Sequence, residues 1–313
     1  MMVVYLDQNK WVDVARVVQD PGAYPDLHRM LTRLAPAIER GDIVFPLSMS
    51  TLYETYKIGD PERRHRLAHV QISFSKGRVF RGRWARLDVE AAAVLRDATG
   101  LSGTAPPDYW FLSDVFLEAF AEGADDGLGG LISPAVVDAI RQHPAHFAYD
   151  WMMDADPDHR RQVVQLFSAG ARVLLEQLEA RRARWMDLTL AMRKRGYGAT
   201  LLLDNQEQFL GVAVQVGLPW RSVADMGSKI AKALVRECPT LNAEREFACR
   251  LEVQSRTLTE NDTRDMYAYT AAVPYADLVI GENQFINLAR QGGLGRTYKT
   301  ELSSDLLSLT SLG

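Results

Sequence analysis

The sequence predicts an α/β fold with a central parallel sheet, interrupted by a long helical insertion. Short apolar runs followed by helical patterns stand at both ends of the 313-residue chain, at residues 3–6 and 278–280. The stretch between them, residues 86–240, has mostly helical apolar spacing. Because short β-rich apolar runs are typical of buried parallel strands, the two ends of the chain are expected to form one sheet.

The N-terminal part predicts a strand, two helices and a second strand. The expected strands are residues 3–6 and 43–47, and the expected helices are residues 11–18 and 27–39. Ser48, Met49 and Ser50 then supply cap candidates for a helix that carries Glu54. Strand, helix and strand in this order form a βαβ unit, which is right-handed in almost all cases.

The middle of the chain predicts helices separated by breaks. The expected helices are residues 87–99, 109–122, 134–142, 161–190 and 206–216, with breaks at residues 105–107 and 125–130. The run at residues 201–203 fits either a strand or a buried helix. The simplest organisation is one discontinuous domain, residues 1–85 and 241–313, with residues 86–240 as a helical insertion.

The C-terminal part returns to strand and helix alternation. The expected elements are helices near residues 244–254, 266–272 and 284–290, and strands at residues 278–280 and 297–301. Asn261 or Asp262 is the expected cap of the second of these helices, which stops at Pro274.

Composition favours an ordinary cytoplasmic protein. The chain is 47% hydrophobic and 24% charged, with a formal charge of −4, so no overall basic field attracts nucleic acid. Basic residues cluster locally at residues 63–66, 76–86, 181–184 and 193–195, where solvated helix faces are the simpler interpretation. Cys238 and Cys249 give neither a disulfide framework nor a zinc spacing. No apolar run approaches the ~20 residues that span a bilayer, and the chain enters a strand too early for a signal peptide.

Four acidic residues follow predicted strands or open predicted helices. Asp7 and Glu282 come just after strands, whereas Glu54 and Asp265 lie near helix starts. Each has a simpler interpretation, as a helix cap, a charge favoured by the helix dipole or an exposed loop acid. Ligands of open α/β sheets bind at the carboxyl edge, so the four acids are expected to converge there. Carboxylate oxygens are ligands that Mg²⁺ or Mn²⁺ prefers.

The same residues resemble the pattern of the PIN-domain nucleases. That pattern begins with an apolar strand ending in Asp, as in Val3-Val4-Tyr5-Leu6-Asp7, and continues with a helix that bears Glu, as in Tyr53-Glu54. It closes with Asp opening a helix, as in Asp265-Met266-Tyr267-Ala268, and with an acid or amide after the next strand, as in Gly281-Glu282-Asn283. The family often has Thr or Ser in place of Gly281 and Asp in place of Asn283. The likeness covers roughly residues 1–75 and 243–313.

The resemblance implies a three-layer α/β/α domain and a metal-dependent endoribonuclease. The implied catalytic residues and ligands of Mg²⁺ or Mn²⁺ are Asp7, Glu54, Asp265 and Glu282, supported by Asn9, Ser48 and Asn283. A cation would relieve the repulsion among the acids and activate water for attack on a phosphodiester. PIN proteins mostly cut single-stranded RNA, and many are bacterial toxins held by an antitoxin; a homo-oligomer is also open.

Two other functions remain open from the sequence. One is a catalytically degenerate PIN-like scaffold that binds RNA, and the other is a structure-specific DNA nuclease. The insertion also bears on RNA binding. Residues 172–195 predict one basic helix, which carries Arg181, Arg182, Arg184, Arg193, Lys194 and Arg195. If that helix overhangs the acidic edge it would hold the RNA backbone; packing elsewhere or a dimer contact is the alternative.

Overall fold

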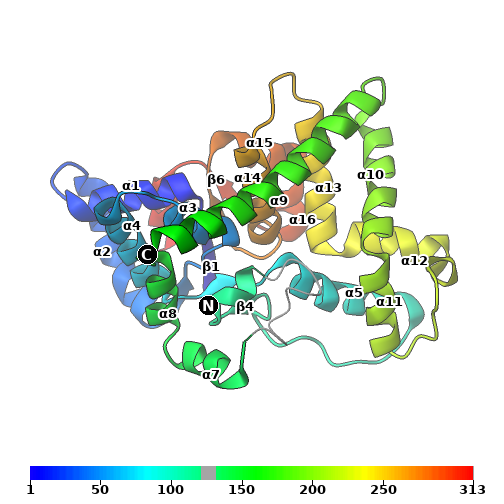
Figure 1. Cartoon of the computed structure of the whole chain (residues 1–313), viewed down its shortest axis with the longest axis horizontal. Helices are drawn as coiled ribbons and strands as arrows, with labels where there is room; N and C mark the ends of the chain where they lie inside the picture. The colour runs from blue at the N-terminus through cyan, green and yellow to red at the C-terminus, as the bar shows by residue number, and fades with distance from the viewer. Residues whose placement is uncertain (121–131, 313) are drawn as a thin grey trace.

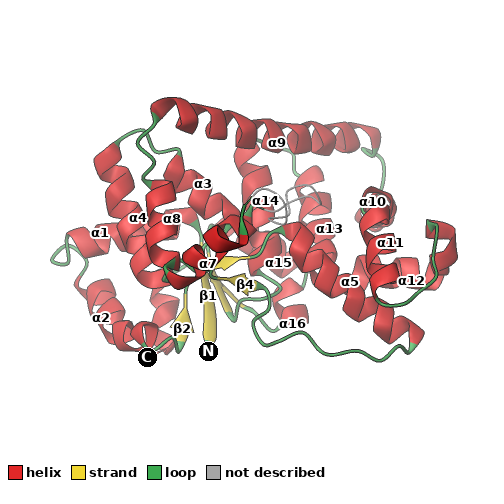
Figure 2. Ribbon diagram, turned by 60° about the horizontal axis from the view of Figure 1, so that its bottom comes forward, coloured by secondary structure: helices red, strands yellow, loops and turns green. Residues whose placement is uncertain are grey.

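The computed structural model describes residues 1–120 and 132–312 and has a mixed α/β fold (Figures 1 and 2). Its strands are β1 (Met2–Leu6), β2 (Ile43–Val44), β3 (Val79–Phe80), β4 (Leu112–Ser113), β5 (Leu278–Ile280) and β6 (Glu301–Ser303). Its first helices are α1 (Gln8–Gln19), α2 (Pro25–Glu39), α3 (Met49–Tyr56), α4 (Pro61–Ser75), α5 (Arg83–Thr99), α7 (Pro134–Gln142) and α8 (Pro144–Met152). The others are α9 (Pro157–Arg184), α10 (Leu190–Asp204), α11 (Gln206–Gln215), α12 (Val223–Glu237), α13 (Pro239–Glu252), α14 (Glu260–Ala272), α15 (Asn283–Gln291) and α16 (Leu294–Tyr298). Two 3₁₀ helices are η1 (Phe116–Ala119) and η2 (Leu306–Leu312).

The two ends of the chain form one parallel sheet, as predicted. Its strand order is β2-β1-β5-β6, and each neighbouring pair is parallel. Leu6 of β1 pairs with Ile280 of β5, so these two central strands end at the same level. The backbone N–H of Asp7 continues the ladder by donating to the carbonyl of Ile280 at 3.0 Å. This register places the residues that follow β1 and β5 side by side.

Helices cover both faces of the sheet (Figure 2). Successive strand side chains point to opposite faces. Tyr5 and Val279 accordingly join one buried core with residues of α5 and α9 to α15, whereas Leu6 and Ile280 join a second core with α1, α2 and α4. Both faces being buried explains why the strands are continuously apolar rather than alternating.

The helices of the predicted insertion share these two cores with the sheet. Leu174 and Leu178 of α9 pack in the same core as Tyr5, and Ile140 of α7 and Met152 of α8 pack in the core of Leu6. The long helix α9 crosses the molecule above the sheet (Figure 2). The helical character predicted for this stretch is confirmed for α5, α7 and α11, whereas the domain boundary at residues 86 and 240 stays a prediction. No helix in the described ranges is long and apolar enough to cross a membrane.

The helix predicted for residues 109–122 is wrong for its described part. Leu112 and Ser113 instead form β4, which pairs antiparallel with β3, and Phe116–Ala119 is a 3₁₀ turn. Tyr109 has φ +56°, a left-handed conformation that interrupts a helix. Pairing with β3 therefore determines the conformation of residues 112–113, although their apolar spacing is helical. The break predicted at residues 125–130 lies outside the described residues.

The single basic helix predicted over residues 161–190 and 172–195 is two helices. α9 ends at Arg184, and α10 begins at Leu190 because the Thr189 hydroxyl caps it by accepting from the Met192 N–H at 3.3 Å. The run at residues 201–203 belongs to α10 and is therefore helical rather than a strand.

Two C-terminal predictions are also corrected. Thr259, and not Asn261 or Asp262, caps α14, because Thr259 and Asp262 form a reciprocal capping box. The last strand begins at Glu301 rather than at residue 297, since residues 294–298 form the short helix α16, which ends where Lys299 turns to φ +60°. The strand at residues 278–280 is confirmed.

Candidate active site

Two of the predicted acids follow the two central strands. Asp7 is 6% exposed and is the N-cap of α1, where its Oδ1 accepts from the Gln8 N–H at 2.8 Å. Glu282 stands directly before α15, and its side chain caps nothing there. Because β1 and β5 end at the same level, both carboxylates belong to one edge of the sheet.

A hydrogen bond between α3 and α14 brings the other two acids to this edge. The Ser50 hydroxyl of α3 donates to the carbonyl of Arg264 on α14 at 2.8 Å. The Arg264 guanidinium also lies over the Tyr53 ring, 5.2 Å from its centroid. Glu54 follows Tyr53 and Asp265 follows Arg264, so this contact fixes the two acids relative to each other.

The four acids interact electrostatically. Burial and then the charges of Asp7, Glu282 and Glu54 raise the pKa of Asp265 to about 8. Burial raises the pKa of Asp7 to about 6, and Glu282 contributes to the rise. Like charges raise the pKa of a carboxyl only at short range. Asp7, Glu54 and Glu282 are therefore within electrostatic range of Asp265.

Little opposing charge faces this cluster. Lys57 holds Glu54 at 2.6 Å, and the Asn9 amide donates to Glu282. Asp265 has no hydrogen bond or ion pair within residues 1–120 and 132–312. No three His, Cys, Asp or Glu side chains of the described residues already form a group that could hold a metal ion. The cluster thus carries excess negative charge without a finished coordination shell.

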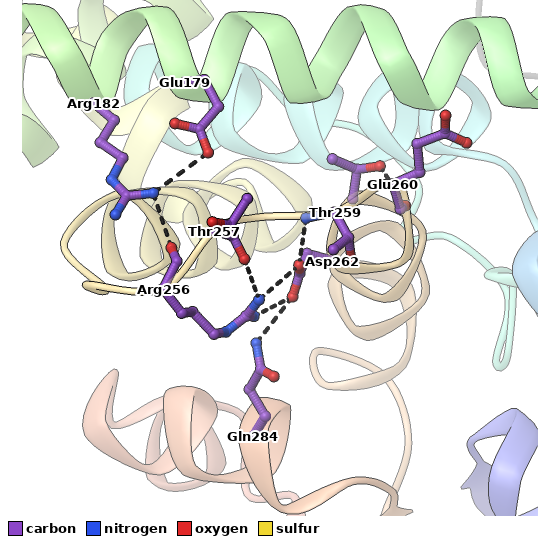
Figure 3. Close-up of polar contacts among 9 residues, drawn as sticks. Glu179, Arg182, Arg256, Thr257, Thr259, Glu260, Asp262 and Gln284 are labelled. Carbon is purple, nitrogen blue, oxygen red and sulfur yellow. Dashed lines mark hydrogen bonds and ion pairs between the residues drawn. The ribbon is translucent and has the colours of Figure 1, made fainter.

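A fifth acid, Asp262, lies nearby but is neutralised (Figure 3). Its carboxylate receives the Arg256 guanidinium at 2.9 Å and the Gln284 amide at 3.0 Å, and it completes the capping box with Thr259. Burial alone would raise its pKa, but the hydrogen bonds from Arg256 and Thr259 hold the pKa of Asp262 below its usual range. Arg182 of α9 donates to the carbonyl of Arg256 at 3.0 Å and so clamps this loop (Figure 3). Asp262 is therefore a structural anion.

Tyr269 connects two of the four acids and was missed by the sequence interpretation. Its hydroxyl donates to Oδ2 of Asp7 at 3.3 Å and accepts from the backbone N–H of Glu282 at 3.0 Å. A Cβ on Gly281 would lie 1.6 Å from this hydroxyl, so glycine is required there. Tyr269 stands four residues after Asp265 and thus on the same face of α14, which is the signal that could have identified it.

Removing the Tyr269 hydroxyl tests its positioning role. Under the nuclease function that the resemblance to PIN domains implies, we expect Tyr269→Phe to lower RNA cleavage about tenfold, in the range typical of residues that orient metal ligands. The hydrogen bond from Tyr269 lowers the pKa of Asp7, so its loss should also move the acidic limb of the pH–rate profile to higher pH. The phenylalanine keeps the ring stacked on Phe285, where the centroids are 4.9 Å apart.

Tyr298→Phe is the matched control, because it removes a hydroxyl bonded to Asn242 on α13 instead. A profile that shifts equally in Tyr298→Phe, or that does not shift in Tyr269→Phe, would assign Tyr269 to packing alone.

The predicted supporting residues have different environments. Ser48 is buried and caps α3 by accepting from the Thr51 N–H at 3.1 Å. Asn9 is exposed and contacts Glu282, whereas Asn283 is exposed as the first residue of α15. Asn9 is thus the one of the three that directly contacts a clustered acid through its side chain.

A closed ring of hydrogen bonds supports the start of α1 next to Asp7. Gln8 donates to Thr55 at 3.1 Å, Thr55 donates to Gln71 at 2.8 Å, and Gln71 donates back to Gln8 at 3.2 Å. Thr55 and Gln71 are fully buried. The ring joins α1, α3 and α4, and it was not predicted from the sequence.

The basic residues predicted to hold RNA are mostly used inside the protein. Arg181 pairs with Glu252 at 2.7 Å, and Arg193 is buried 3.8 Å from the same carboxylate. Lys194 pairs with Glu246 at 2.7 Å. A buried Glu252 needs compensating charge, so these cations stabilise the contact between α9, α10 and α13. For Arg181 and Arg193, the alternative that the basic helix packs elsewhere in the protein is therefore the one that the structure shows.

Comparison with known proteins leaves the function to be inferred from the site. No family model, curated protein or solved structure matches the chain. The inference rests on the four carboxylates near the carboxyl edge of the parallel sheet.

Proposed function

We propose that the protein is a metal-dependent endoribonuclease that cleaves single-stranded RNA, with a three-layer PIN-like domain. The carrying observation is that four carboxylates from distant parts of the chain act on one another at the edge where ligands of such sheets bind. Holding them together costs free energy in the absence of a cation, because like charges oppose each other's ionisation. Ionisable groups with strongly shifted pKa values are found most often at functional sites.

The donor set fits Mg²⁺ or Mn²⁺ by its chemistry. Asp7, Glu54, Asp265 and Glu282 offer hard carboxylate oxygens and no sulfur or imidazole, which is the set these cations prefer. Asp265, whose side chain has no polar partner among the residues that the structure describes, is the acid that most needs a cation. Asp7, Glu54, Asp265 and Glu282 would hold the ion, with Lys57 beside Glu54 at 2.6 Å. When bound, the ion would polarise the phosphodiester and lower the pKa of a water molecule.

The residues of the chain would position the reacting groups. Hydrolysis requires a water oxygen to bond to phosphorus while the bond to the leaving oxygen breaks and that oxygen takes up a proton. Tyr269 orients the carboxylate of Asp7, and Asn9 orients that of Glu282. Lys57, which pairs with Glu54, is a cation next to the cluster that would contact a substrate phosphate. The acids would thus bind the cation, and Tyr269 and Asn9 would orient the acids.

A second candidate is a degenerate PIN-like scaffold that binds RNA without cutting it. Two observations favour it: the described acids do not yet form a metal-holding group, and the Tyr269 hydroxyl fills the space beside Gly281. Cytoplasmic location, a toxin role with an antitoxin partner, and homo-oligomerisation rest on composition or on the resemblance, and they remain predictions.

Metal-dependent cleavage is the direct test of the proposed function. We expect labelled single-stranded RNA to be cut with Mn²⁺ or Mg²⁺ and to stay intact with EDTA, because chelation removes the positive charge that the acids need. Single-stranded DNA and a DNA flap are run beside it under the same conditions. Cleavage of the flap alone would replace the proposal with a DNA nuclease, and RNA binding without cleavage in either metal would support the scaffold.

A further inference from the structure

A positively charged groove lies between α10 and α12, away from the acidic cluster. Its volume is ≈ 940 Å³, and α13 contributes to its wall. The five basic residues that line it are Lys194 and Arg195 of α10, Lys232 and Arg236 of α12, and Arg245 of α13. In Figure 1, α13 stands between this pair of helices and α14, which carries Asp265. The groove and the acidic edge are thus on opposite sides of one helix.

Helical spacing places these cations along the groove. Lys194, Arg195 and Gly198 occupy one stripe of α10, and Lys232 and Arg236 occupy one stripe of α12, each with residues three or four apart. Much of the rest of the lining consists of small side chains, together with Leu202 and Val235. Gly198 permits the close packing of α12, since a Cβ there would lie 3.1 Å from Val235. Exposed cations beside small residues leave room for a chain to lie along the groove.

The positive charge of the groove is not balanced within the described residues. Its one lining acid, Glu246, is already held by Lys194 at 2.7 Å and by Arg250. Arg195, Lys232 and Arg236 are exposed and make no ion pair with any residue in the ranges 1–120 and 132–312. Nε of Arg245 is buried there without a hydrogen-bond partner. Burial lowers the pKa of Arg245, and the charge of Arg236 lowers it further.

Charge and shape together favour a phosphodiester chain as the occupant. A helix of a protein partner would need pockets for large apolar anchoring side chains, and the larger apolar residues of this lining are Leu202 and Val235, beside five cations. Phosphates need only positive charge along an accessible track. We propose that this groove binds the backbone of the single-stranded RNA substrate, several nucleotides away from the cleaved bond. This inference rests on the proposed function for the identity of the nucleic acid.

Charge reversal in the groove tests the inference separately from cleavage. Arg195→Glu combined with Lys232→Glu changes one exposed cation on each side. The control combines Arg33→Glu on α2 with Lys229→Glu, an exposed lysine of α12 that does not line the groove. Both proteins carry the same net charge. Binding of a labelled 20-nucleotide RNA is measured by fluorescence anisotropy in EDTA across a range of salt concentrations, and circular dichroism confirms folding.

We expect the groove variant to bind at least about tenfold more weakly and to lose roughly 1.4 from the slope of log affinity against log salt, about 0.7 for each lost phosphate contact. The control should keep the wild-type slope. Equal weakening of both variants, or competition by polyglutamate as strong as by RNA, would overturn the assignment. If the groove variant binds RNA more weakly but the wild type never cleaves RNA, the nuclease proposal is contradicted and the groove assignment is supported. If the wild type cleaves RNA but the groove variant binds it as tightly as the wild type does, the groove assignment is contradicted and the nuclease proposal is supported.

Discussion

Asp7→Asn is expected to abolish metal-dependent cleavage while the melting temperature stays the same or rises. Asparagine is as good an N-cap as aspartate, so the bond from the Gln8 N–H to the side-chain oxygen survives. The negative charge that raises the pKa of Asp265 is removed, which relieves repulsion in the folded state. A gain in stability with a loss of activity is what a strained functional site predicts.

The expected loss of activity is at least about a hundredfold, because even residues that only orient metal ligands typically account for 10- to 100-fold. Initial rates on single-stranded RNA and thermal unfolding without metal are the measurements. Asp13→Asn is the control, since Asp13 is another acid of α1 and pairs with Arg16 on the surface. Undiminished cleavage by Asp7→Asn would show that Asp7 is only a helix cap.

The parallel sheet, and the placement of the acids within electrostatic range of one another, could be predicted because both follow from local pattern and topology. Buried parallel strands are short apolar runs, and the carboxyl ends of adjacent parallel strands share an edge. Leu6 and Ile280 end their strands at the same level, so Asp7 and Glu282 had to be neighbours once both strands were placed. Asp265 needed the additional knowledge that α14 packs on α3.

Other features could not be predicted because they depend on long-range partners. Leu112 is a strand residue only because β3 offers an edge, and nothing in its own neighbourhood distinguishes it from a helical one. Arg181 belongs to the interior only because Glu252, 71 residues later, is buried beside it. The Tyr269 hydroxyl acquires a role only where Gly281 lacks a side chain. Local spacing contains none of these pairings.

The metal-free protein is expected to lose stability as the pH rises from about 4 to about 8. A carboxyl whose pKa is higher in the folded than in the unfolded chain holds its proton longer when folded, so deprotonation favours unfolding. The penalty begins near the unfolded value of 3.8 and is complete once the pH passes the folded pKa, about 6 for Asp7 and about 8 for Asp265. Each group contributes at most about 1.4 kcal/mol per pH unit in its window.

Asp7 and Asp265 should account for only part of this slope, because burial also raises the pKa values of Asp88, Glu90 and Glu252. Asp262 has a lowered pKa and acts in the opposite direction, so the comparison that isolates the effect is between wild type and Asp265→Asn. The free energy of unfolding, measured by denaturant titration in EDTA from pH 4.5 to pH 8.5, should fall less steeply in the variant. Mn²⁺ at about 100 times its dissociation constant should raise the free energy of unfolding of the wild type by about 2.7 kcal/mol.

At one fixed Mn²⁺ concentration, the stabilisation should be greater at pH 8 than at pH 5, because a cation binds the deprotonated carboxylates and must displace protons at the lower pH. Metal stabilisation that is independent of pH, or equal in Asp265→Asn, would place the ion elsewhere on the protein. A wild-type slope equal to that of Asp265→Asn in EDTA would mean that Asp265 is already compensated in solution. In that case the repulsion among the four acids, from which the need for a metal was inferred, would not exist.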